Sequence, residues 1–477
     1  MMKINEMLRG GAARSVIAPY RWRVMLVALA TLFAAAPLTV QAGDGLNPQF
    51  LRWRKMKAAG MLPQQKAEAR ERKAAQQNIS LQAAKGARMV GVDDQPAGLA
   101  PDVKSFSYLA DIVGGKGWEP VNGYPSRFDL REHGNVTAVR NQGEFETCWA
   151  FASMGSLESA ILVQKPEGYS YTANDIDFSE RHMVDNHGFD LTAKQGGSML
   201  MAMSYLLRWG GPVSEVDSPY PAPGTTEWST SSVIADPRLH VQQVRFIPGK
   251  TTWTGNDDIK NAVMNYGAVY TTFYMDKKAY YNESKQAYRC PYSMQPNHGV
   301  LIVGWDDDYP ASNFGKIFLD NIFIDNGAYL VKNSWGSEWG DDGYFWVSYY
   351  DHNFAVSTMA VFSGNESKAN YATIYQYDEL GYTGDFKPGD SRMNAGWMAN
   401  VFTATSDDQI AAVGFYVLAP NTSYQIRVYT DIPEGGTPKD GTLKYSNTQT
   451  GSFSYAGYVT VPLDKVVPVK SGSRFAV

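Results

Sequence analysis

The stretch Asn141-Gln142-Gly143-Glu144-Phe145-Glu146-Thr147-Cys148-Trp149-Ala150-Phe151 places a cysteine where a helix is expected to begin. Apolar residues recur at three- and four-residue steps from Cys148 to Gln164, which predicts an amphipathic helix over 148–164. The first turn of a helix stabilises an anion through unpaired main-chain N–H groups and the helix dipole, and this lowers the pKa of a thiol. Cys148 is therefore either a reactive thiol or a small buried hydrophobic residue, and this stretch alone leaves both open.

Two later segments carry further polar side chains beside predicted strands. Asn297-His298-Gly299 opens an apolar run over 299–305, which predicts a buried strand. Lys332-Asn333-Ser334-Trp335-Gly336 follows a second predicted strand over 329–332, and a third is predicted over 344–349. Taken separately, His298 is a structural histidine and Asn333-Ser334 is ordinary turn chemistry.

Together, the three segments match the motifs of a known family. Gln142-Gly143 with Cys148-Trp149-Ala150-Phe151, then Asn297-His298-Gly299-Val300, then 332–345 in the same order, resemble the papain-like cysteine peptidases. The histidine follows the cysteine by 150 residues, while Asn333 lies 185 residues after it because an acidic, Asn-rich insertion (306–327) lengthens the gap. The resemblance covers 119–364 and implies an α+β fold with two lobes, one helical and one a β-barrel.

The resemblance also implies a role for each matching residue. Cys148 is implied to be the nucleophile, His298 the general base and acid, and Asn333 the residue that holds His298. Gln142 is implied to donate to the oxyanion. The implied substrate-binding residues are the backbone-binding pair Gly196 and Gly197, the subsite residues Ser198, Met199 and Pro296, and Trp335, which shields the His–Asn hydrogen bond.

Three positions depart from the family pattern. Phe145 replaces the cysteine of a usual disulfide, so that bridge cannot form. Glu146 stands where the family has glycine, so its carboxylate is expected to oppose thiolate formation and to disfavour acidic substrate residues. Cys290 has no partner other than Cys148 and is interpreted as a structural free thiol.

The amino-terminal region has the pattern of an export signal. Basic residues precede an apolar run over 24–40 that closes with Val40-Gln41-Ala42, which predicts a signal peptide over 1–42; an uncleaved anchor is the alternative. No later segment is apolar enough to span a membrane, so we expect an exported protein in an extracellular, cell-surface or periplasmic location. Residues 43–118 are rich in basic residues and are either a solvated leader or a pro-segment across the acidic body.

The pattern of hydrophobic and polar residues changes after residue 364. Short alternating runs over 411–417, 424–429 and 457–461, separated by Gly, Pro, Asn and Asp, predict an all-β sandwich over 365–477. This part resembles the lectin-like domain that follows papain-like peptidases in some bacterial surface proteins, and its last residues read as the middle of a strand, so truncation is expected there. Trp397 and exposed tyrosines are candidates for stacking on sugars, with buried sheet aromatics as the other interpretation.

Composition limits the function further. The 477 residues are 44% hydrophobic and carry a net charge of −5, which favours large folded domains and excludes a nucleic-acid partner. Two cysteines and scattered histidines give no metal-ligand spacing, and no cofactor is expected. The leading hypothesis is a secreted cysteine endopeptidase acting on proteins or peptides. The alternatives are a non-catalytic adhesin that binds cell-surface glycans and an acyl transferase, or transpeptidase, that uses the same triad.

Overall fold

The computed structural model describes residues 98–100, 109, 123–231, 233–253, 256–315, 324–382, 395–446 and 451–477. The predicted signal peptide (1–42) and most of the predicted leader (43–118) lie outside the described residues. Within the described ranges, no helix combines the length and the apolar character that crossing a bilayer requires.

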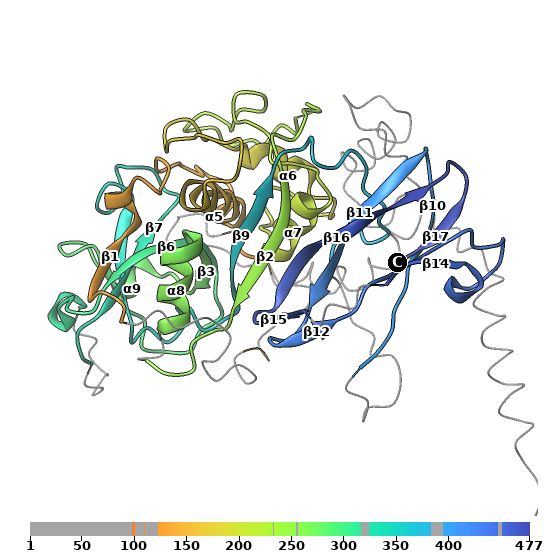
Figure 1. Cartoon of the computed structure of the whole chain (residues 1–477). Helices are drawn as coiled ribbons and strands as arrows, with labels where there is room; N and C mark the ends of the chain where they lie inside the picture. The colour runs from red at the N-terminus through yellow and green to blue at the C-terminus, as the bar shows by residue number, and fades with distance from the viewer. Residues whose placement is uncertain are drawn as a thin grey trace, which may run out of the picture. The chain divides into compact units, whose positions relative to one another are not determined.

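Helices gather in the first half of the described chain (Figure 1). The predicted helix at Cys148 is α5 (Cys148–Gln164), with the predicted bounds. It is not amphipathic as expected, because every residue from Cys148 to Leu162 is buried. Neighbouring segments cover it on all sides, so its apolar spacing does not mark a solvent boundary. The other helices are α6 (Glu180–Asn186), α7 (Met199–Leu207), α8 (Asp257–Tyr266) and α9 (Lys277–Tyr280).

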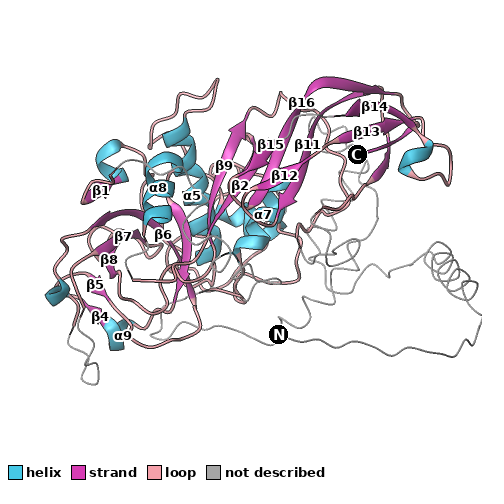
Figure 2. Cartoon of the chain, turned by 60° about the horizontal axis from the view of Figure 1, so that its bottom comes forward, coloured by secondary structure: helices cyan, strands magenta, loops and turns pink. Residues whose placement is uncertain are grey.

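One large sheet forms the second layer of the fold (Figure 2). The predicted strands 299–305, 329–332 and 344–349 are β6 (His298–Asp306), β7 (Ala328–Lys332) and β8 (Tyr344–Ser348), paired antiparallel in that order. The sheet runs β11-β16-β2-β9-β3-β6-β7-β8-β5-β4, and β1 also pairs with β6. The remaining members before residue 370 are β1 (Arg127–Asp129), β2 (His240–Ile247), β3 (Val269–Phe273), β4 (Tyr281–Asn282), β5 (Ala287–Tyr288) and β9 (Met359–Glu366).

The C-terminal part is all β, as predicted. Its strands are β10 (Val401–Thr403), β11 (Asp408–Val417), β12 (Thr422–Tyr424), β13 (Arg427–Thr430), β14 (Thr442–Ser446), β15 (Gly451–Phe453), β16 (Gly457–Val469) and β17 (Arg474–Ala476). The single strand predicted over 424–429 is wrong: β12 and β13 belong to different sheets, and the chain changes sheets at Gln425-Ile426.

The C-terminal strands continue the large sheet. Strand β16 pairs antiparallel with β2, with Gly457 opposite Arg245 and Tyr458 opposite Val244. The Arg245 guanidinium lies over the Tyr266 ring at 4.2 Å and over the Tyr455 ring at 3.8 Å, so one cation contacts aromatic rings on both sides of the junction. Figure 1 shows β2 and β9 beside β11 and β16.

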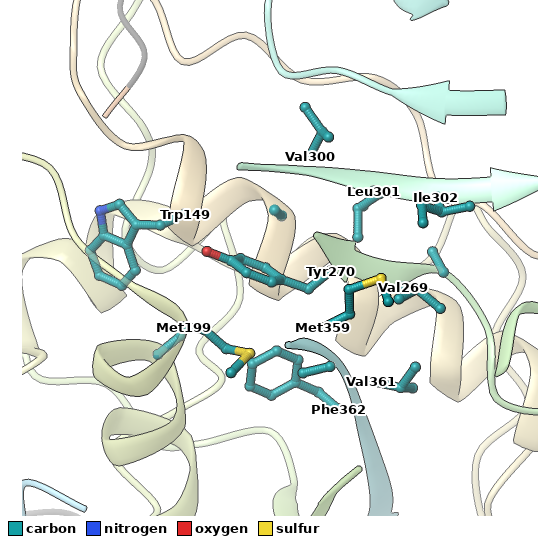
Figure 3. Packing of buried hydrophobic residues seen from close by; sticks show 14 of the residues in the cluster. Trp149, Met199, Val269, Tyr270, Val300, Leu301, Ile302, Met359, Val361 and Phe362 are labelled. Atoms are coloured by element: carbon teal, nitrogen blue, oxygen red, sulfur yellow. The ribbon is translucent and has the colours of Figure 1, made fainter. Parts of the chain in front are cut away.

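The packing of α5 against the sheet positions the functional residues. Helix α5 contacts β6, β9 and β3, and a Cβ added at Gly155 would lie 2.5 Å from the Leu301 side chain. Trp149, from the first turn of α5, belongs to a buried cluster with Met199 and Tyr270 (Figure 3). Because this close packing fixes the helix against β6, Cys148 and His298 are held at adjoining element ends.

Candidate active site

Cys148 lies at the first position of α5, against the first strand residues of β6. The Gly299 N–H donates to Cys148 Sγ at 3.2 Å, and the thiol is fully buried. The N–H groups of Cys148 and Trp149 also face the sulfur. Since the first N–H groups of a helix have no intrahelical acceptor, this end of α5 supplies donors to a sulfur anion, as the sequence predicts.

His298 is held by two neighbours from the loop after β7. Its Nε2 lies 2.8 Å from Asn333 Oδ1, so this nitrogen donates to the amide oxygen. The Trp335 ring stacks on the imidazole with a centroid separation of 4.7 Å and covers it on one face. These contacts match the arrangement expected for an imidazole held in one orientation.

The loop before α5 holds the Gln142 side chain by both ends. Ser334 Oγ donates to Gln142 Oε1 at 2.7 Å, and Gln142 Nε2 donates to the Phe145 carbonyl at 2.8 Å. The Tyr220 hydroxyl donates to the Gln142 carbonyl at 2.9 Å and contacts Thr147 Oγ1 at 2.6 Å. These contacts hold the Gln142 amide in one orientation beside the start of α5.

A buried charge network lies behind the site, next to Asn333. Lys332 Nζ donates to the Thr137 carbonyl at 2.9 Å, and Thr137 Oγ1 donates to Glu158 Oε2 at 2.6 Å. Burial lowers the pKa of Lys332 to about 8 and raises the pKa of Glu158. A cavity lined by Lys332, Glu158 and Glu180 adjoins Asn333. The network ties α5 to β7 and so fixes the strand end that presents Asn333.

Residues 98–100 lie across the site. Gly98 forms an antiparallel bridge with His298, and Leu99 forms a parallel bridge with Gly197. The Gly197 N–H donates to the Gly98 carbonyl at 3.0 Å, and the Ala100 N–H donates to the Gly197 carbonyl at 2.8 Å. Farther along the predicted leader, Leu109 is fully buried in the same core cluster as Trp149. This part of the leader therefore packs on the body rather than into solvent.

The electrostatics of the covered thiol differ from the expectation of a lowered pKa. Burial raises the pKa of Cys148 to about 12, and the Glu146 carboxylate raises it further. The N–H groups of Gly299 and Trp149 act in the opposite direction but are outweighed by the loss of water. In this covered state the thiol is protonated, because desolvation dominates the stabilisation by the helix end.

The residues predicted to bind substrate take different positions. Gly196 and Gly197 lie against residues 98–100 and Trp149: Gly196 has φ +76° and an added Cβ would lie 2.7 Å from the Gly98 carbonyl oxygen, and a Cβ at Gly197 would lie 2.2 Å from the Trp149 ring. Pro296 is partly exposed just before Asn297, whose carbonyl accepts from the Leu99 N–H at 3.3 Å. Ser198 and Met199 begin α7 and are buried, and Figure 3 shows Met199 among core side chains.

Both cysteines are free, in agreement with the interpretation of Cys290, which is buried and whose thiol pKa burial raises to about 11. Among the described residues, no group of three or more His, Cys, Asp or Glu side chains is placed to hold a metal ion. The sequence analysis did not identify Tyr220, the hydrogen bond from Ser334 to Gln142, or the network of Lys332, Thr137 and Glu158. Ser334 could have been identified from the sequence, because it directly follows Asn333 in the matched motif.

Family models match two parts of the chain. The model described as papain family cysteine protease matches residues 124–363, and the model described as lectin like domain matches residues 374–477. The first match spans half of the chain, and the chain belongs to the papain family of cysteine proteases. This finding and the geometry confirm the predicted α+β fold with an all-β lectin-like domain after it.

Individual relatives agree with this assignment. The chain is 32% identical over 237 residues to cysteine proteinase 1 of Zea mays, which covers 47% of this chain and 57% of that protein. The chain spans less than two thirds of the length of the curated relatives it matches first.

Two solved structures resemble a large part of the chain. The cysteine protease and lectin-like domains of Cwp84, a surface layer associated protein of Clostridium difficile, share the fold with a TM-score of 0.59, at 24% identity, over 85% of this chain and 82% of that chain. The clostridial cysteine protease Cwp84 after propeptide cleavage has a TM-score of 0.56, at 26% identity, over 74% and 83%.

Proposed function

We propose that this chain is a cysteine endopeptidase that hydrolyses peptide bonds of protein or peptide substrates through Cys148, His298 and Asn333. The observation that carries the proposal is the pair of contacts around His298: Nε2 against Asn333 Oδ1 at 2.8 Å, and the adjoining Gly299 N–H against Cys148 Sγ at 3.2 Å. These contacts support the proposal because they bring the start of α5, the start of β6 and the loop after β7 to one place, as a Cys-His-Asn arrangement requires.

The proposed reaction begins with proton transfer from the thiol to His298 Nδ1. The Cys148 thiolate attacks the substrate carbonyl carbon, and the C=O electron pair moves onto oxygen. When the tetrahedral intermediate collapses, the C–N bond breaks and the imidazolium gives its proton to the leaving amine. Water, deprotonated by His298, then attacks the thioester, and the thiol leaves with the proton. Asn333 keeps the imidazole oriented through both steps.

Gln142 is the proposed side-chain donor to the oxyanion, together with the Cys148 N–H. Ser334 accounts for the direction of its amide, because a donor at Oε1 fixes that atom as oxygen and turns Nε2 toward the start of α5. Tyr220 braces the same loop from the other side through Gln142 and Thr147. Preorganised donors of this kind act without rearrangement during the reaction.

We further propose that residues 43–118 form a pro-segment that blocks the groove. Gly98, Leu99 and Ala100 take up the hydrogen-bonding groups of Gly197 and Asn297, which a substrate main chain needs. The structure of Cwp84 after propeptide cleavage supports this interpretation by analogy. Removal of the segment would open the groove and return water to the thiol.

Labelling with an epoxide that alkylates activated thiols tests the proposed function. The chain is labelled before and after limited proteolysis of the segment that precedes residue 123. We expect a Cys148 adduct that increases after proteolysis, together with cleavage of fluorogenic peptides. Cys290→Ala should retain both signals, and Cys148→Ala should lose both. Labelling of neither cysteine in the opened chain would contradict the proposal and favour a non-catalytic adhesin.

Hydrolysis and acyl transfer share the thioester and differ in what attacks it. We propose water, and product masses with and without an added primary amine decide between the two. An amide adduct that dominates at millimolar amine would assign the chain as a transferase.

For the C-terminal domain we propose glycan binding, favoured by Trp397. This side chain is 57% exposed, and the Arg427 guanidinium lies 4.2 Å from its ring centroid, which orients the indole. We also propose export, on the strength of the signal pattern in 1–42. Trp397→Ala should abolish binding to a glycan array, whereas Val466→Ala, at another exposed apolar residue of this domain, should not; equal binding by both would refute the sugar site.

A further inference from the structure

Glu146 lies on the floor of the groove, two residues before Cys148. Its N–H donates to the Ala193 carbonyl at 2.8 Å, which ties it to the segment that leads to Gly196 and Gly197. With residues 98–100 in place Glu146 is buried, with 5% of the residue exposed. Glu146 therefore joins the two segments that border the groove, under the chain that occupies it.

The chain in the groove passes directly over Glu146. A Cβ added at Gly98 would lie 2.2 Å from the Glu146 carbonyl carbon and 2.6 Å from its Cα. Gly98 also forms the antiparallel bridge with His298. A peptide residue at this point therefore lies between the proposed base on one side and Glu146 on the other.

The charge of Glu146 acts at the reacting atoms. Its carboxylate is among the groups that raise the pKa of Cys148, so it lies within electrostatic range of the sulfur. The acyl residue of a substrate has its carbonyl carbon bonded to that sulfur during the reaction, and its side chain begins one atom farther away. A long side chain on that residue can therefore extend toward Glu146, whose main chain lies directly under the chain in the groove.

Two other charged side chains belong to the segments that contain Glu146 and Ala193. Lys194, next to Ala193, pairs with Glu227 at 3.3 Å. Glu144, in the same loop as Glu146, is exposed to solvent. Since interactions between charges strengthen as water is excluded, the buried carboxylate of Glu146 has far more influence on a groove occupant than the exposed one.

We propose that Glu146 is a specificity-determining residue that makes the site select peptides with Lys or Arg at the residue whose carbonyl is attacked. This inference rests on the proposed peptidase function. A cationic side chain would form a charge-assisted hydrogen bond with the carboxylate, while Asp or Glu would meet repulsion. A hydrogen bond to a charged group corresponds to a preference of roughly 10- to 100-fold over an uncharged side chain of the same shape.

Two fluorogenic peptides that differ only in arginine or citrulline at that residue test the proposal, because citrulline keeps the shape and removes the charge. The enzyme is opened by proteolysis of the leader, and its active fraction is counted with the epoxide. We expect the kcat/KM ratio of arginine to citrulline to be at least 10 for the parent, to fall severalfold at high salt, and to approach 1 in Glu146→Gln. Glu144→Gln is the matched control and should keep the parent ratio.

The outcomes separate the two proposals. A parent enzyme that takes the label and cleaves both peptides equally overturns the role of Glu146, whether or not Glu146→Gln folds. An unchanged ratio in folded Glu146→Gln overturns it as well. A parent that takes no label and cleaves neither peptide contradicts the peptidase function itself.

Discussion

A substitution at Gly98 tests the proposed block of the groove. Gly98 has φ +90°, in the left-handed region that glycine tolerates, and its Cα lies against the Glu146 main chain. Gly98→Ala would place a methyl group 2.2 Å from the Glu146 carbonyl carbon, far inside contact distance. The docked segment must then shift, since main chain on both sides leaves no flexible atom to move.

The size of the effect follows from two costs. An L-residue at positive φ costs about 1–2 kcal/mol, and forcing an extra carbon into a packed contact typically costs about 1–3 kcal/mol. Together these destabilise the docked segment by about 2–5 kcal/mol. At about 1.4 kcal/mol per factor of ten, the open fraction should rise roughly 30- to 4000-fold.

The assay is the rate of epoxide labelling of Cys148 in the full, unproteolysed chain. When the open form is a minor species, this rate is proportional to the open fraction, so it should rise in Gly98→Ala by the same factor. Gly123→Ala is the control. Gly123 also has a positive φ, +74°, but no heavy atom lies within 4 Å of an added Cβ. It reproduces the backbone strain without a contact in the groove.

An unchanged labelling rate in Gly98→Ala would refute the block by residues 98–100. Equal acceleration in Gly98→Ala and Gly123→Ala would show that any strained glycine loosens the chain, and would count against the specific contact.

Three further predictions follow from the site and its surroundings. Gln142→Ala should lower kcat/KM roughly 100-fold, by about 3 kcal/mol of lost oxyanion stabilisation, in peptide hydrolysis assays; a loss below threefold would contradict that role. Ser334→Ala should lower kcat about 3- to 10-fold with little change in KM, because it removes the hydrogen bond that orients Gln142, and it should have no further effect in the Gln142→Ala background. The free energy of unfolding in urea should decrease as the pH falls from 6.5 toward 3, because burial lowers the pKa of His187 to about 3, and in this range the unfolded state binds a proton that the folded state does not. His187→Gln should weaken this pH dependence. His133→Gln, at an exposed position, should leave it unchanged.

The sequence was sufficient for the local parts of the site. The bounds of α5 and the ordered motifs around His298 and Asn333 follow from short-range patterns, and the geometry of these side chains agrees with them. The amphipathic character expected of α5 failed because periodicity reports a preferred face, whereas burial depends on which segments pack around a helix. That information is spread over α7, β3 and β9 and is not readable from residues 148–164.

The contacts of the leader were beyond sequence reasoning for a similar reason. Gly98-Leu99-Ala100 has no distinctive motif, and the complementarity lies in the groove that receives it. The same holds for the sheet that continues from β2 into β16: the start of β16 was predicted from alternation over 457–461 and β2 was not predicted, and their pairing joins residues more than 200 positions apart. Non-local pairing of this kind depends on tertiary packing and leaves no local signal.

The raised pKa of Cys148 and the occupied groove have one physical origin. The donors that favour the thiolate belong to α5 and β6, so they remain in place when residues 98–100 leave. Desolvation is the largest cause of the raised pKa of Cys148, and under the proposed pro-segment role it should decrease when residues 98–100 leave. Opening the groove should therefore have two effects. It admits a peptide, and it lowers the pKa of Cys148, because the helix end and the imidazole then act against a smaller desolvation. Under the proposed pro-segment role both effects come from the same contacts, so the covered chain should be inactive through the protonated sulfur as well as through the blocked path.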